Sequence, residues 1–186
     1  GRGVMYGVRR LLRALRLEPG AIRLDSDFDL ASAPAYPIRG HQIGYRARAN
    51  SYDAWTPGQY EQYIRDLIVF GANCIENIPL QDTQSSPLMP VPRPEMNRRL
   101  SAICADCDID YWAWMPADFP LTDASRRSNA LEEHETFYRA CPRLDAVFFP
   151  GGDPGENPPD LVIPFLQDLA VLLARYHPRA RIWVSL

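Results

Sequence analysis

Five short runs of apolar residues recur along the chain at a nearly constant spacing. The runs begin at Ile38, Cys74, Ile109, Ala146 and Ile182, so that successive runs start 36, 35, 37 and 36 residues apart. Between them, apolar residues recur with the period of a helix that buries one face. Because strands and helices alternate in this way, the pattern predicts right-handed strand–helix–strand units and a parallel sheet.

Residues typical of helix ends support the predicted helices. The first follows Thr56, with Pro57 at its first position and Gln59 at its third, a capping-box pattern, and it ends at Gly71. The next two helices are expected at about 94–107 and about 129–141, and Asp160 is expected to cap the last one.

Two architectures fit this order of elements, a (β/α)8 TIM barrel and an open doubly wound sheet. A doubly wound sheet usually carries a Gly-rich phosphate turn after its first strand, whereas the corresponding loop, 45–50, has no G-x-G-x-x-G. A complete barrel takes roughly 250 residues. The 149 residues from Ile38 onward hold about four and a half units. We therefore expect an α/β fold that contains about strands 1–5 of a TIM barrel.

The segment ahead of the first apolar run has a different character. Apolar residues and arginines predict a helix over 4–16, and a short strand is expected over 21–24. We expect residues 1–36 to be the C-terminal end of an accessory α/β domain with its connector. Residues 37–186 are expected to be the N-terminal half of a catalytic barrel, so that the chain is an internal fragment.

Composition excludes several functions. The chain is 46% hydrophobic and 23% charged, with a net charge of −3. It has neither a basic patch long enough for nucleic acid nor a run of about 18 apolar residues that would span a membrane. All 20 basic residues are arginine, which excludes a Schiff-base lysine within this span.

The four cysteines do not indicate a metal site. Cys104 and Cys107 form a C-x-x-C pair, but they continue the apolar stripe of Met96, Leu100 and Ile103 on one predicted helix. Since no second C-x-x-C and no nearby histidine completes a zinc site, we expect core packing, with no metal and no cofactor. The cysteines leave the compartment open between a periplasmic or secreted and a cytoplasmic location.

Polar and aromatic side chains gather where a barrel places its active site, at the ends of its strands. They are Arg39, His41, Gln42, Tyr45, Glu76, Asn77, Trp112, Trp114, Asp118, Asp153 and Glu156. A sugar ring needs this mixture, because its apolar face stacks on indole while its hydroxyls bind arginine, amide and carboxylate groups. Paired carboxylates are also the groups that cleave glycosidic bonds.

The loop after the fourth apolar run, Pro150 to Asn157, is the most unusual stretch of the chain. Gly151-Gly152 allows a tight turn, and Pro154 stiffens the backbone beside Asp153. Asp153 is therefore the first candidate for a catalytic carboxylate, and Glu156 is the candidate acid. A turn-stabilising role for the Asp-Pro-Gly sequence explains the same residues and stays open.

These motifs resemble glycoside hydrolases with a (β/α)8 barrel, particularly family 67 (α-glucuronidases) and families 20 and 84 (hexosaminidases). Tyr36-Pro37-Ile38-Arg39-Gly40 is similar to the first-strand entry of family 20, and Gly44-Tyr45 is similar to the corresponding step of family 84. Gly151-Gly152-Asp153 matches part of the Gly-Gly-Asp-Glu motif of family 20, with Pro154 in the position of the general acid. The resemblance implies that Arg39 binds substrate hydroxyls and that Asp153 assists catalysis.

The sequence thus predicts a glycoside hydrolase that acts on a carbohydrate substrate. It does not determine the oligomeric state. The expected catalytic residues are Asp153 and Glu156, and the expected substrate-binding residues are Arg39, His41, Tyr45, Glu76, Asn77, Trp112, Trp114 and Asp118. Two alternatives remain. One is a catalytically inactive barrel that binds glycans, and the other is a metal-dependent sugar isomerase-type barrel with Glu76, Asp118 and Asp153 among its ligands.

Overall fold

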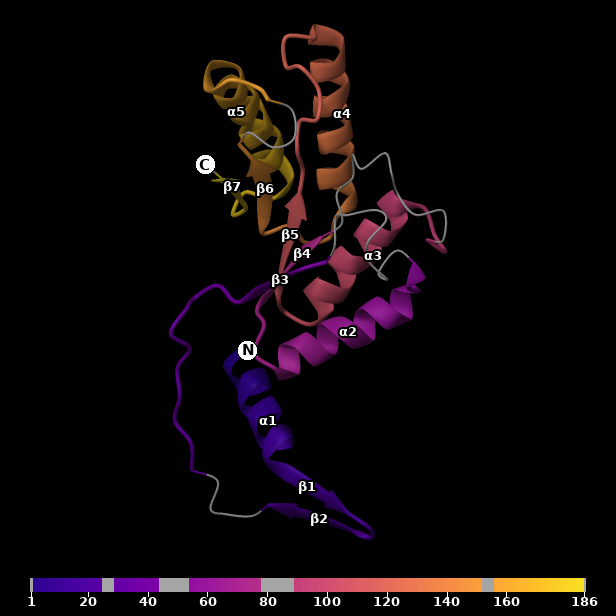
Figure 1. Cartoon of the computed structure of the whole chain (residues 1–186), viewed down its shortest axis with the longest axis vertical. Coiled ribbons are helices and arrows are strands. Elements are labelled where there is room, and N and C mark those ends of the chain that lie inside the picture. Colours follow the sequence, from indigo (N-terminus) through magenta and orange to yellow (C-terminus); the bar gives the residue numbers. More distant parts are fainter. Residues whose placement is uncertain (1, 25–28, 44–53, 78–88, 152–155, 186) are drawn as a thin grey trace.

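A parallel sheet of five strands forms the centre of the computed structural model, which describes residues 2–24, 29–43, 54–77, 89–151 and 156–185 (Figure 1). The strands are β3 (Gly40–Gln42), β4 (Cys74–Asn77), β5 (Asp110–Trp114), β6 (Ala146–Pro150) and β7 (Arg181–Ser185). They lie in the order β3-β4-β5-β6-β7, and each pairs in parallel with the next. The predicted α/β class, the five strand positions and the parallel pairing are confirmed.

Four helices connect these strands: α2 (Pro57–Val69), α3 (Arg93–Asp106), α4 (Ala124–Ala140) and α5 (Pro159–Tyr176). Helix α2 has the predicted capping box at Thr56 and ends at Val69, with Phe70 as its C-cap. The predicted end residue, Gly71, follows directly, and its φ of 99° is accessible to glycine. Helix α4 begins earlier than predicted, because Asp123 caps it by accepting hydrogen bonds from two backbone amides. The predicted cap at Asp160 is wrong: α5 begins at Pro159, so that Asp160 lies in its first turn.

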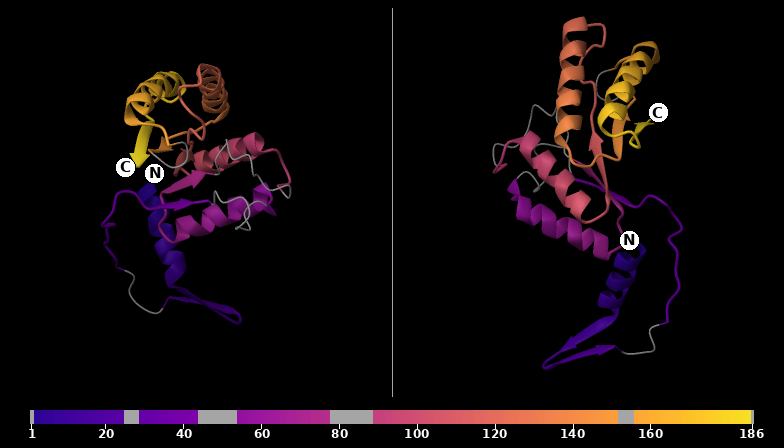
Figure 2. Two further views of the ribbon diagram at one scale, coloured as in Figure 1. Left: turned by 45° about the horizontal axis from the view of Figure 1, so that its top comes forward. Right: turned by 180° about the vertical axis from the view of Figure 1, so that it is seen from behind.

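The helices cover one face of the sheet, because the strand order never reverses among the five described strands. A right-handed connection to the next strand in the same direction places its helix on the same side each time. Accordingly Ile75 and Tyr111, which are register partners, and Val147, the register partner of Ala113, are fully buried under the helices. Figure 2 shows α2 to α5 arranged around this side of the sheet.

The core consists of two adjoining clusters on the helix-covered side. The larger joins α2 and α3 to β4 and β5 through residues such as Ile64, Leu100 and Tyr111. The smaller joins β6 to α5 and to the segment between β5 and α4, and it is centred on Phe149 and Phe165. Each buried side chain of this size contributes about 1.5–3 kcal/mol, so the helix-covered face supplies most of the stability.

A helix and a hairpin precede the sheet. Helix α1 (Arg2–Ala14) packs at the amino edge of the sheet, where the Tyr6 hydroxyl donates to the Ala72 carbonyl at 3.0 Å. Strands β1 (Leu15–Glu18) and β2 (Ala21–Leu24) form an antiparallel hairpin that projects away from the sheet (Figure 1). The predicted helix and the strand at 21–24 are confirmed, except that the last two residues of the predicted helix, Leu15 and Arg16, begin β1. The assignment of residues 1–36 to an accessory domain stays a prediction.

The Tyr111 hydroxyl gives a direct test of this packing. It is fully buried, donates to the Asn97 carbonyl at 3.0 Å and accepts a hydrogen bond from the Asn77 side-chain amide. Tyr111→Phe removes the acceptor from a buried amide, so we expect the free energy of unfolding to fall by about 1–3 kcal/mol. Denaturant unfolding measures the change.

Tyr36→Phe is the matched control, because it deletes the same hydroxyl from a side chain that is 74% exposed. We expect it to change stability by less than about 0.5 kcal/mol. Equal effects of the two substitutions would contradict the buried network.

Candidate functional site

The face of the sheet opposite the helices carries a coherent set of large side chains. Strand alternation and register place on it Gln42, Glu76, Trp112, Trp114, Phe148 and Trp183, which together we term the open face. All of them retain exposure, unlike Ile75 and Tyr111 on the other face. Among the described residues, the open face is therefore the side of the sheet on which large side chains keep contact with solvent.

Glu76 is the ionisable group of this face with a perturbed pKa. Burial raises the pKa of Glu76 to about 6, although a hydrogen bond from Gln42 favours the ionised form and opposes that rise. A carboxyl whose pKa lies near neutrality exchanges its proton readily, as a general acid or base must. Gln42 belongs to the adjacent strand and lies beside Glu76 in register, so the sheet itself orients the pair.

Two indoles stack on the same face. The rings of Trp112 and Trp183 are 5.5 Å apart between centroids and nearly parallel, at 19°. The strand between them carries Ala146, whose small side chain leaves room for both rings and is itself buried. Sequence reasoning predicted Trp112 and Trp114 but missed Trp183. The register would have found it, since Trp183 aligns with Trp114 across Phe148.

Three predicted site residues do not lie on the open face. Arg39 precedes β3 at the amino edge, where its guanidinium donates to the carbonyls of Gly71 at 2.8 Å and Tyr36 at 2.7 Å. His41 points to the helix side and hydrogen-bonds the Tyr63 hydroxyl at 2.7 Å, and burial lowers its pKa.

Asn77 is fully buried on the helix side, against Tyr111. These three side chains hold the fold together, and we leave them out of the candidate site. The physical reason is strand alternation: neighbouring residues of a strand point to opposite faces.

Two further predicted residues lie on loops at the carboxyl edge of the sheet. Asp118, after β5, and Glu156, after β6, are both exposed. The side chain of Asn157 joins these two loops through hydrogen bonds to the backbone of Ala117, Phe119 and Leu121. Tyr45 and Asp153 lie outside the described residues.

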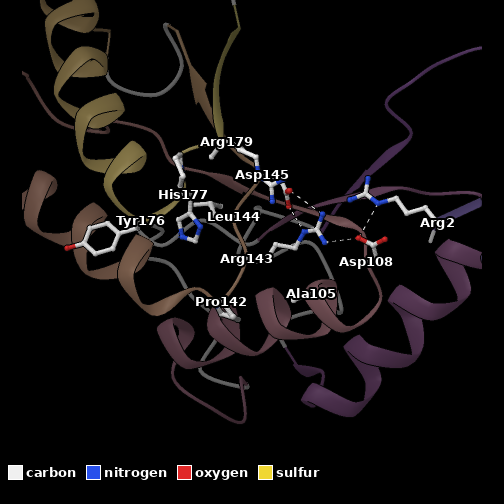
Figure 3. Close-up of a pocket in the computed structure, with 12 residues that line it drawn as sticks. Arg2, Ala105, Asp108, Pro142, Arg143, Leu144, Asp145, Tyr176, His177 and Arg179 are labelled. Carbon is white, nitrogen blue, oxygen red and sulfur yellow. Dashed lines mark hydrogen bonds and ion pairs between the residues drawn. The ribbon is translucent and has the colours of Figure 1, made fainter.

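A hollow of about 710 Å³ lies at the opposite, amino edge (Figure 3). Its most prominent group is Arg143, which donates to Asp145 at 2.7 Å, to Asp110 at 2.9 Å and to Asp108 at 3.2 Å. Arg2 of α1 also pairs with Asp110, at 2.6 Å. Because these arginines are already paired with carboxylates, the cluster serves to attach α1 to the sheet.

Cysteines and acidic residues give no metal centre in the described part of the chain. No group of three or more histidine, cysteine or acidic side chains there is placed to hold a metal ion. Cys104 is buried in the main core, as expected from its helical stripe, and burial raises its pKa well above the ordinary value. The C-x-x-C pair therefore contributes to packing.

Glu76 is expected to make stability depend on pH. Its pKa is raised from 4.5 to about 6 in the folded protein, so between these values the folded state holds a proton that the unfolded state has lost. The free energy of unfolding should therefore fall as pH rises through this window. Above pH 6 this loss of stability should be complete, and it should amount to about 1 kcal/mol after allowance for partial exposure.

Glu76→Gln should remove this loss of stability and raise the free energy of unfolding at pH 7.5 by about 1 kcal/mol. Denaturant unfolding across pH 4 to 8, with the exposed Glu133→Gln as control, measures the difference. An identical pH profile for wild type and Glu76→Gln would contradict the assignment.

Comparison with known proteins adds no assignment to this geometry. Neither the scan against protein-family models nor the search of curated proteins finds a match to the chain. Within the described residues, no helix is long and apolar enough to cross a membrane.

Proposed function

We propose that this chain is the front half of a (β/α)8 barrel glycoside hydrolase and that the open face lines its substrate pocket. One observation carries the proposal: the face that the helices leave uncovered combines a carboxyl of raised pKa with a stacked pair of indoles. The carboxyl can move a proton, as cleavage of a glycosidic bond requires, and the indoles can hold the sugar ring.

The strand order supports the barrel. Five strands follow one another without reversal, with their helices on one side, as in a barrel, whereas a doubly wound sheet reverses at its switch point. In a barrel the opposite face points to the axis and is filled by large side chains. Trp112, Trp114 and Phe148 fit that requirement.

The proposed chemistry is acid/base hydrolysis. Glu76 donates its proton to the glycosidic oxygen, the bond from this oxygen to the anomeric carbon breaks, and water supplies the hydroxyl that replaces the leaving sugar. A second carboxylate activates that water or attacks the anomeric carbon directly. The loop after β6 offers Asp153 and Glu156 for this role, at the edge where barrels carry their catalytic groups.

A glycan-binding barrel without catalysis is the second candidate. The observation in its favour is that the stack of Trp112 on Trp183 forms a platform that does not depend on any carboxyl. The isomerase-type alternative stays a prediction, because Asp153, one of its three expected ligands, lies outside the described residues.

Activity of the longest natural protein that contains this sequence tests the proposal. We expect it to hydrolyse at least one member of a panel of aryl-glycosides and glucuronic-acid-decorated xylo-oligosaccharides. Glu76→Gln and Asp153→Asn should each lower kcat by about 100-fold or more, and Glu133→Gln should leave it unchanged. Well-folded protein that hydrolyses nothing contradicts the hydrolase, and glycan binding without product supports the second candidate.

The indole platform has its own test. Trp112→Ala removes one ring of the stack, and we expect about tenfold weaker oligosaccharide binding by calorimetry, which corresponds to about 1.4 kcal/mol. Trp55→Ala is the matched control, because Trp55 packs on Tyr60 and Tyr63 of α2, away from the open face. Equal losses for both substitutions would show that the stack has no binding role.

A further inference from the structure

The backbone after β6 adopts a conformation that its residue type disfavours. Glu156 has a φ of 46°, in the left-handed region where the β-carbon of an ordinary residue crowds the backbone. Asp108, with a φ of 50°, has an ordinary reason for the same conformation. It follows the C-terminus of α3, where its amide donates to the Ala105 carbonyl, and left-handed residues commonly end helices.

Glu156 has no such reason, because it precedes a helix. It lies two residues ahead of Pro158, the N-cap of α5, so its conformation does not close any helical turn. Strained backbone in a non-glycine residue persists only where the surroundings hold it, and such residues cluster at functional sites.

The neighbouring Asn157 is what holds this backbone. Its side-chain oxygen accepts from the Leu121 amide at 2.8 Å, and its side-chain nitrogen donates to the carbonyls of Phe119 at 2.9 Å and Ala117 at 3.3 Å. These three partners belong to the irregular segment between β5 and α4, and their side chains are buried, with exposures of 4%, 6% and 1%. Backbone groups in a buried segment need hydrogen-bond partners, so the Asn157 side chain, which we term the anchor, is tightly held.

The anchor fixes one loop of the carboxyl edge against the next. The three hydrogen bonds join residues 36 to 40 positions apart, and they leave the adjacent Glu156 side chain exposed. A carboxylate that must meet a substrate gains from such an arrangement, because the next residue is held by hydrogen bonds while the carboxylate itself remains accessible.

We propose that Asn157 is a positioning residue, which holds the strained Glu156 backbone so that the Glu156 carboxylate acts on the sugar substrate at the carboxyl edge. This inference rests on the proposed function. It adds to that function the second carboxylate and the residue that places it.

Kinetics of the longest natural protein that contains this sequence tests the inference, well below its unfolding temperature and on the substrate that the wild type hydrolyses. We expect Asn157→Ala to lower kcat by about 10- to 100-fold with little change in KM. In a Glu156→Gln background the same substitution should have no further effect on kcat, because the two residues act as one unit. A merely structural role would not produce this non-additivity.

Two control variants separate positioning from folding. Asp123→Ala removes the N-cap of α4 in the same region without touching the hydrogen bonds of Asn157, so it should lower the unfolding temperature and leave kcat unchanged. Glu156→Gly suits the left-handed backbone and should fold at least as well as the wild type, yet lose about 100-fold in kcat.

The outcomes distinguish this inference from the function on which it rests. A wild type that hydrolyses nothing overturns both. An active wild type with an active Glu156→Gly variant overturns the inference alone, and so does a loss in Asp123→Ala equal to that in Asn157→Ala. With an active wild type, loss of kcat in Glu76→Gln would still support the proposed function when the inference itself fails.

Discussion

The handedness of the strand connections is the constraint on which the rest of this structure depends. Each right-handed connection adds its strand on the same side of the previous one, so α2 to α5 accumulate on a single face. That face forms the core through Ile75, Tyr111 and Val147. The other face keeps its large side chains uncovered. The same rule thus creates both the stability of the fold and the surface on which we place its function.

The two faces give neighbouring residues opposite roles. Glu76 and Asn77 are adjacent in β4, yet Glu76 keeps part of its surface in contact with solvent while Asn77 is fully buried against Tyr111. Partial burial raises the pKa of Glu76 to about 6, because the neutral form tolerates a low dielectric better than the ionised form does. A fully exposed carboxyl would lack this property, so the half-covered position is what brings the pKa of Glu76 close to neutrality.

The two edges of the sheet are also unlike. At the amino edge Arg143 and Arg2 are paired with Asp108, Asp110 and Asp145, which attaches α1 to the sheet and leaves these charges mutually satisfied. At the carboxyl edge Asn157 satisfies the backbone of a neighbouring loop, while Asp118 and Glu156 remain exposed. Structural pairing therefore dominates one edge, and accessible carboxylates lie at the other.

The sequence by itself determined the alternation of strands and helices, the parallel sheet and the capping of α2 at Thr56, because periodicity and end signals are local properties. It did not determine which face the helices cover, since Tyr111 and Trp112 are adjacent and both large and aromatic. Nor did it place Arg39 and His41, whose partners Gly71 and Tyr63 lie more than 20 residues away. Only the tertiary structure brings together the residues of the candidate site, because register and handedness place Glu76, Trp112 and Trp183 from separate strands on one face.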